Sequence, residues 1–126
     1  MFEINSSKKV ELLSKVYDHA KKSYKYGFRL LTLGWSDGNT FLPINSCLLS
    51  SENKKNRIIE AKSLDKRTNG YARRALAKTK ATSVMMELID QAQKANIPAS
   101  YVLFDTWFCF PASITQIKKK GLDVIA

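Results

Sequence analysis

An apolar run, Tyr101–Phe104, leads directly into Asp105. A continuous run with β-branched and aromatic members predicts a strand that is buried on both faces. The carboxylate then follows the strand at the carboxyl edge of the sheet, where open α/β sheets bind their ligands. Because burial of a lone carboxylate is costly unless a cation pairs with it, the pattern favours a metal ligand. The alternative is an aspartate that caps the next helix.

A second apolar pattern predicts a hairpin. Residues 24–35 are rich in β-forming residues, and residues 36–39 (SDGN) are typical of a tight turn. Residues 40–49 then return as a partner strand, and Pro43 places that strand at an edge or a bulge. We expect these two strands to pair antiparallel, with residues 101–105 inside the same sheet beside the first of them.

Helical periodicity is clearest over residues 79–95, with Thr79 or Thr82 as the cap. Its expected apolar face comprises Ala81, Val84, Met85, Leu88, Ile89 and Ala92. Pro111 opens another helix as its first residue, and Gly121 ends that helix before a buried strand at residues 122–126.

The N-terminal region is ambiguous. Val10, Leu13, Val16 and Tyr17 recur at helical spacing and predict a helix within residues 6–22. A strand followed by a turn at Asp18-His19 also fits. Taken together, the elements predict one α/β domain, with a mixed sheet and packed helices.

Composition and charge narrow the classes of function. The chain has 126 residues, 44% of them hydrophobic, which suits a single domain. Lys and Arg number 21 against 11 Asp and Glu, and the net charge of +10 favours a polyanionic partner, most often nucleic acid. No apolar run is long enough to span a membrane, and the N-terminus lacks a signal-peptide pattern, so we expect a cytoplasmic protein without a membrane partner. Cys47 and Cys109 share no metal-binding spacing, and His19 has no nearby nucleophile.

The positive charge is concentrated in a basic segment, residues 54–80, which holds 10 of the 21 basic residues. We expect an excursion from the core that is partly helical near 71–78, with an exposed loop around Asn69-Gly70. Dense charge of one sign favours contact with nucleic-acid phosphates, and the alternative is a solvated loop. The candidate DNA-binding residues are Lys54, Lys55, Arg57, Lys66, Arg67, Arg73 and Arg74.

Five blocks in one order resemble the catalytic core of bacterial insertion-sequence transposases of the DDE type, in the group with a long insertion in that core. The blocks are SKKVELL (7–13), GFRLLTLGWSDGNTFLP (27–43), SSENKKNR (50–57), DKRTNGYARR (65–74) and YVLFDTWFCFP (101–111). The resemblance covers nearly the whole chain from about residue 6. It implies a ribonuclease-H-like fold and an enzyme that cuts and joins DNA at the ends of transposable elements.

The resemblance also implies a metal site in which three acidic residues hold two divalent ions, Mg²⁺ in the complete enzyme. Asp105 matches the second of these acids and is the candidate catalytic and metal-binding residue. The first acid of the family precedes the SKKVELL block, where this chain has no Asp and Glu3 is the only acid. The third acid of the family matches a position after Ala126. The expectation is therefore an incomplete core domain over residues 1–126, truncated at both ends and inactive by itself. A homodimer of the full-length parent is left open.

Two other hypotheses remain. One is a non-catalytic, basic nucleic-acid-binding protein, such as a decayed transposase remnant. The other is an unrelated small nuclease that uses Asp105 together with Asp90 or Asp123. Asp90 is expected on a helix away from the strand end, and Asp123 at the opposite edge of the sheet if the two strands are parallel.

Overall fold

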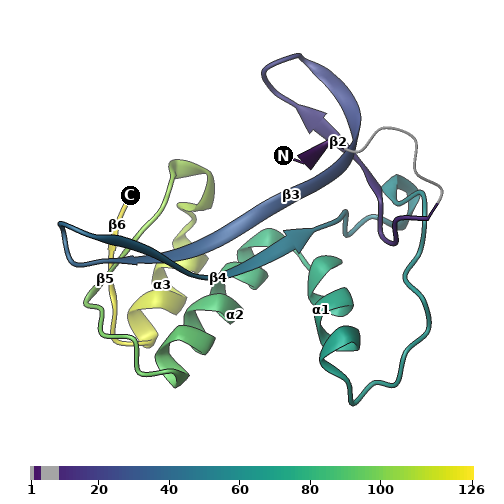
Figure 1. Cartoon of the computed structure of the whole chain (residues 1–126). Coiled ribbons are helices and arrows are strands. Elements are labelled where there is room, and N and C mark those ends of the chain that lie inside the picture. Colours follow the sequence, from purple (N-terminus) through teal and green to yellow (C-terminus); the bar gives the residue numbers. More distant parts are fainter. Residues whose placement is uncertain (1, 4–8) are drawn as a thin grey trace. The chain divides into compact units, whose positions relative to one another are not determined.

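The computed structural model describes residues 2–3 and 9–126, which form a mixed α/β structure (Figure 1). Its elements are β1 (Phe2–Glu3), β2 (Ser14–Asp18), β3 (Ser23–Ser36), β4 (Phe41–Leu49), η1 (Lys54–Asn56), α1 (Asn69–Ala77), α2 (Ala81–Lys94), β5 (Tyr101–Leu103), η2 (Thr106–Phe108), α3 (Pro111–Lys119) and β6 (Asp123–Ile125). Two compact units divide the chain. The first takes the described residues of Met1–Thr32 together with Ser46–Ala81, and the second takes Leu33–Asn45 with Thr82–Ala126.

The predicted hairpin is confirmed, since β4 pairs with β3 across a short turn (Figure 1). So short a connection requires antiparallel strands, because parallel strands need a long crossover. Gly38 adopts a positive φ of 96° in the turn, and the Asp37 carboxylate accepts hydrogen bonds from the amides of Asn39 and Thr40 at 2.9 and 2.7 Å. Within the described sheet β4 pairs with β3 alone, as expected for a strand that contains Pro43.

The N-terminal helix expected within residues 6–22 is wrong over the part that the structure describes. Residues 14–18 form β2, which pairs antiparallel with β3 so that Ser14 lies opposite Gly27 and Asp18 opposite Ser23. Ser14 and Val16 are buried while Lys15 and Tyr17 are exposed, which is the two-residue period of a strand. The alternative, a strand that ends in a turn at Asp18-His19, is therefore the correct one; residues 6–8 lie outside the described residues.

The first unit is built on a small core of Leu12, Leu13, Phe28 and Ala77. The chain just after η1 closes over this core, because the amide of Ile58 donates to the Leu13 carbonyl and the amide of Leu12 donates to the Ile59 carbonyl, both at 2.8 Å. Part of the basic segment is thus fastened to the core.

A second correction concerns Asn69-Gly70. These residues form the first turn of α1 and not an exposed loop. The Thr68 hydroxyl accepts a hydrogen bond from the amide of Tyr71 at 3.2 Å and caps the helix. A threonine before an Asn-Gly pair satisfies one of the free amides at a helix start, which outweighs the turn preference of that pair.

In the second unit, α2 and α3 confirm the predicted helices. Val84 and Ile117 are fully buried, and Gly121 ends α3 with a positive φ of 80°. The two helices are joined by polar contacts: Lys120 pairs with Asp90, and the Gln93 amide donates to the Lys120 carbonyl at 3.0 Å. Thr79 does not cap α2; its hydroxyl donates to the Ala75 carbonyl at the end of α1.

The expectation that residues 101–105 lie inside the hairpin's sheet is wrong. Only Tyr101–Leu103 is extended, and β5 pairs in parallel with β6 in a separate two-stranded sheet. The exposed fractions of Tyr101 and Leu103 are 58% and 71%, so β5 is not buried on both faces. The same holds for β6, where Ile125 is 50% exposed. An apolar run indicates a strand, but burial depends on what covers it.

An ion pair between Glu11 and Arg74 makes the first unit sensitive to acid. The Arg74 Nε donates to Glu11 Oε2 at 2.7 Å, and the Lys62 amide donates to the same oxygen at 3.1 Å. These bonds lower the pKa of Glu11 from 4.5 to about 2, and the bond from Arg74 has the larger effect. Because the folded pKa lies below the unfolded one, the stabilisation is complete above pH 4.5 and is lost as the pH falls towards 2.

We therefore expect Glu11→Gln to lower the melting temperature at pH 7 and to flatten its decline between pH 4.5 and 2. Thermal unfolding followed by circular dichroism across this range measures both effects. Glu52→Gln is the matched control, since the Glu52 side chain is exposed and its bond to Arg57 uses the backbone carbonyl. An unchanged pH profile in Glu11→Gln would show that the pair does not stabilise the fold.

Candidate functional site

Asp105 lies just after β5, two residues beyond the strand's last residue, Leu103. The parallel partner β6 ends at Ile125, opposite Leu103, so Asp105 follows the carboxyl end of this small sheet. That is the predicted position. Its environment differs from the prediction, because Asp105 is exposed and is the N-cap residue of η2. The capping alternative is therefore part of what this residue does.

Hydrogen bonds to one of its two oxygens hold the Asp105 carboxylate in place. Oδ1 accepts hydrogen bonds from the Thr106 hydroxyl at 2.9 Å and from the Trp107 amide at 3.3 Å. The Thr106 bond is the larger of the causes that hold the pKa of Asp105 below its ordinary value. Within the described part of the chain Oδ2 accepts no hydrogen bond, and Asp105 as a residue is exposed.

The two other acids considered as partners do not converge on Asp105. Asp90 pairs with Lys120. Asp123 lies opposite Tyr101, at the amino end of the same parallel pair of strands. The geometry within this unit thus gives no support to a nuclease built on Asp105 with Asp90 or Asp123.

The donor set does not make a complete metal site among the described residues. Across residues 2–3 and 9–126, no group of three or more His, Cys, Asp or Glu side chains is placed to hold a metal. Mg²⁺ needs near-octahedral oxygen ligands, and a single carboxylate oxygen supplies one position. Glu3 lies on β1 with its backbone opposite Gly27, and its side chain is outside the described part.

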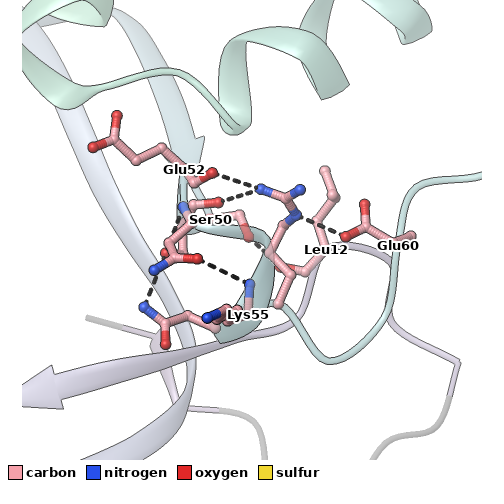
Figure 2. A network of polar contacts seen from close by, with 9 residues as sticks. Leu12, Ser50, Glu52, Lys55 and Glu60 are labelled. Carbon is pink, nitrogen blue, oxygen red and sulfur yellow. Dashed lines mark hydrogen bonds and ion pairs between the residues drawn. The ribbon is translucent and has the colours of Figure 1, made fainter.

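Three of the seven candidate DNA-binding residues are engaged by the protein itself. Arg57 is the most buried, with a side chain 9% exposed that donates to Glu60 at 2.9 Å and to the carbonyls of Ser51 and Glu52 at 2.8 and 3.1 Å. Figure 2 shows the polar contacts of this region, which also include the Ser50 hydroxyl donating to the Leu12 carbonyl and the Lys55 amide donating to Asn53. Arg74 binds Glu11, and the exposed Arg67 binds Asp65 at 2.8 Å.

The remaining four candidates, Lys54, Lys55, Lys66 and Arg73, are exposed. Lys54 and Lys55 lie on η1, whose N-cap Asn53 accepts from the Lys55 amide at 3.0 Å. Lys66 lies in the loop before α1, and Arg73 lies on that helix. These four exposed charges thus lie at three places in the first unit.

Thr106 is a site residue that the sequence reasoning missed. Its hydroxyl donates to the carboxylate of Asp105 and fixes its orientation. The signal was present in the Asp-Thr pair that follows an apolar strand, because short polar side chains at such a point bond to each other and to the next turn.

Comparison with known proteins identifies the family of the chain. A family model described as DDE superfamily endonuclease matches residues 3–126. Searches of curated proteins and of solved structures each found no match. None of the helices in the described ranges is long and apolar enough to cross a bilayer. Nucleases of the DDE superfamily generally use divalent metals, and their substrate is DNA. The match spans nearly all of the sequence, and the chain therefore belongs to the DDE superfamily of endonucleases.

Proposed function

We propose that the chain is the part of a DNA transposase that supplies one metal-binding aspartate, Asp105, and a basic surface for DNA. The complete enzyme cuts and joins phosphodiester bonds at the ends of a transposable element. The observation that carries this proposal is the exposed Asp105 carboxylate just after β5, whose hydrogen bonds hold its pKa below the ordinary value, in a chain that belongs to the DDE family.

The electrostatics of Asp105 suit a ligand for a hard cation. Both of its hydrogen bonds stabilise the charged carboxylate, so it stays ionised at neutral pH and does not have to lose a proton when a cation binds. Because the described residues do not bring a group of three metal-binding side chains together, no catalytic step can be derived from Asp105 alone. We infer that the other ligands, for Mg²⁺ as in the family, come from outside the described residues.

The DNA-binding part of the proposal rests on charge. Lys54, Lys55 and Lys66 are exposed in the first unit, and Arg73 is exposed on α1. The charge of the basic segment is dense and Tyr71 is its only aromatic residue. Contact with phosphates is therefore the interaction that we expect of these residues. Arg57 and Arg74 form ion pairs within the fold, while Arg67, which is exposed, remains able to contact DNA beside its bond to Asp65.

Replacing Lys54, Lys55 and Lys66 with Ala should weaken DNA binding and reduce its dependence on salt. Loss of three phosphate contacts lowers the slope of log K against log salt by about 2.7, at about 0.9 per contact. Filter binding of a labelled duplex between 50 and 200 mM salt (roughly the range in which such contacts are resolved) measures the slope.

The matched control removes the same charge from the second unit, as Lys94, Lys118 and Lys119 to Ala, all of which are exposed lysines. We expect this variant to retain the original slope. Equal slopes in all three proteins would show that the basic segment is a solvated surface and would remove it from the proposal.

A second candidate function is DNA binding without cleavage. The lack of a cluster of metal-binding side chains in the described part of the chain favours it. Metal-dependent cleavage of a labelled duplex by a longer chain, lost on Asp105→Asn, would exclude this candidate. A homodimer of such a longer chain stays a prediction.

A further inference from the structure

One surface that the proposed function does not use is a face of the hairpin between β2 and β3. In its register Lys15 lies opposite Tyr26, and Tyr17 lies opposite Tyr24. Since side chains alternate between the two faces of a strand, these four residues share one face. We call them the tyrosine face. The exposed fractions of Tyr17, Tyr24 and Tyr26 are 40%, 62% and 52%, so the face presents large aromatic surface to solvent.

Two of the three tyrosine rings, Tyr17 and Tyr24, pack on each other. Tyr17 packs edge-to-face against Tyr24, with ring centroids 5.2 Å apart and an interplanar angle of 68°. His19 packs against Tyr17 in the same manner at 4.9 Å, and the Lys15 Nζ lies 4.9 Å from the centroid of the Tyr24 ring. The Tyr17 and Tyr24 rings, held in this way, lose little freedom when a flat ligand binds beside them, which lowers the cost of binding.

The surroundings of the tyrosine face are positive. Lys21 and Lys22 are exposed in the turn that joins the strands, beside Lys15 on the face itself. Asp18, the last residue of β2, accepts hydrogen bonds from the amides of Ala20 and Lys21 at 3.0 and 3.3 Å, so its carboxylate stabilises the turn. A partner for this face therefore needs flat rings for the tyrosines and negative charge for the lysines.

We propose that the tyrosine face binds unpaired nucleotides of the DNA, by stacking bases on Tyr24 and Tyr26 while the lysines contact the adjoining phosphates. Aromatic side chains interleaved with basic ones are the means by which proteins bind single strands. In duplex DNA the bases are already stacked on each other, so the rings cannot reach them. The inference rests on the proposed function in that DNA is the partner, and it adds a preference for strands that are not paired.

The test compares the wild-type chain with a variant that carries Tyr24→Ile and Tyr26→Ile. Isoleucine keeps the strand preference of these positions and removes the ring faces. Fluorescence anisotropy gives the affinity for a single strand and for a duplex of equal length at one salt concentration. We expect the single strand to bind about tenfold more weakly to the variant and the duplex to change by less than about twofold.

Two further measurements separate stacking from a structural role. In the wild type, 2-aminopurine placed in the single strand should lose fluorescence on binding, and the variant should not quench it. Tyr101→Ile is the matched control, because Tyr101 is an exposed strand tyrosine in the other unit. Circular dichroism shows whether the variant keeps its fold.

The outcomes are distinct. Equal weakening of single-strand and duplex binding would mean that the tyrosines only hold the hairpin together. A variant that loses folded structure but still quenches 2-aminopurine in each bound strand would lead to the same conclusion. An unchanged single-strand affinity would overturn the stacking inference and leave the proposed function intact. Failure of the wild-type chain to bind either form of DNA would overturn both.

Discussion

Replacing Asp105 with Ala or Asn, in a longer chain that supplies the other metal-binding acids, should reduce strand cleavage to the level seen without enzyme. DNA binding should remain within about twofold, because it depends on exposed lysines and not on this carboxylate. Asn retains the size of the side chain and its carbonyl oxygen but removes the charge that attracts a divalent ion. Cleavage of a labelled duplex, run beside a gel-shift measurement, separates the two effects.

Asp123→Asn is the matched control for this prediction, because it removes the same charge from the other end of the same pair of strands. It should leave cleavage unchanged. The 126-residue chain itself should not cleave with Mg²⁺ or Mn²⁺. Cleavage by this chain that is lost on Asp105→Ala would point to a missed ligand, with Glu3 the first to test. Cleavage by the longer chain that survives Asp105→Ala would leave Asp105 with its capping role alone.

Replacing Ile117 with Ala should lower the free energy of unfolding by about 2–5 kcal/mol, the largest stability effect we expect. Ile117 is fully buried on α3, and removal of three of its carbons leaves a cavity that the surrounding helices cannot fill completely. A loss of this size is a large fraction of the total stability of a small domain. Urea unfolding followed by circular dichroism measures it.

The same replacement at Ile125 provides the comparison, since that side chain is 50% exposed in the same unit. The loss of unfolding free energy in Ile125→Ala should be well under half of that in Ile117→Ala, because folding buries less of the Ile125 side chain. Equal losses at the two positions would show that α3 is not packed as the structure has it.

Local signals predicted the hairpin and the helices well. The turn at residues 36–39 and the start of α3 at Pro111 each depend on residues that restrict the backbone at that point. β2 was harder, because the apolar positions before Tyr17 fit a helix as well as a strand. Pairing with β3 decides between the two, and that pairing cannot be read from the segment alone.

The position of the candidate site was predictable, whereas its surroundings were not. An apolar run that ends in an acid indicated the carboxyl end of a strand, and Asp105 lies there. The run carries no information on how many strands lie beside it, and β5 has one described partner. The exposure of Asp105 therefore could not be inferred from its apolar neighbours.

The basic segment illustrates a different limit. Counting charges treats all seven basic candidates alike. The structure separates them, because Arg74 is paired with Glu11, 63 positions earlier in the sequence, and Arg57 is bound to backbone carbonyls. Every residue has a backbone carbonyl, so the sequence does not indicate which carbonyls accept hydrogen bonds from an arginine. Which arginines hold the fold is thus a tertiary property.

The two units are interleaved in the sequence, and this bears on the order in which they can form during synthesis. The hairpin tip, Leu33–Asn45, belongs to the second unit but leaves the ribosome before Ser46–Ala81, which completes the first. Trp35 donates to the Pro98 carbonyl and Asn45 to Gln91, so the tip finds its partners only after more than 45 further residues have been made. At about 5–20 residues per second, the tip is left without them for several seconds. During that interval its exposed apolar residues, Phe41 and Leu42, are open to chaperones and to other nascent chains.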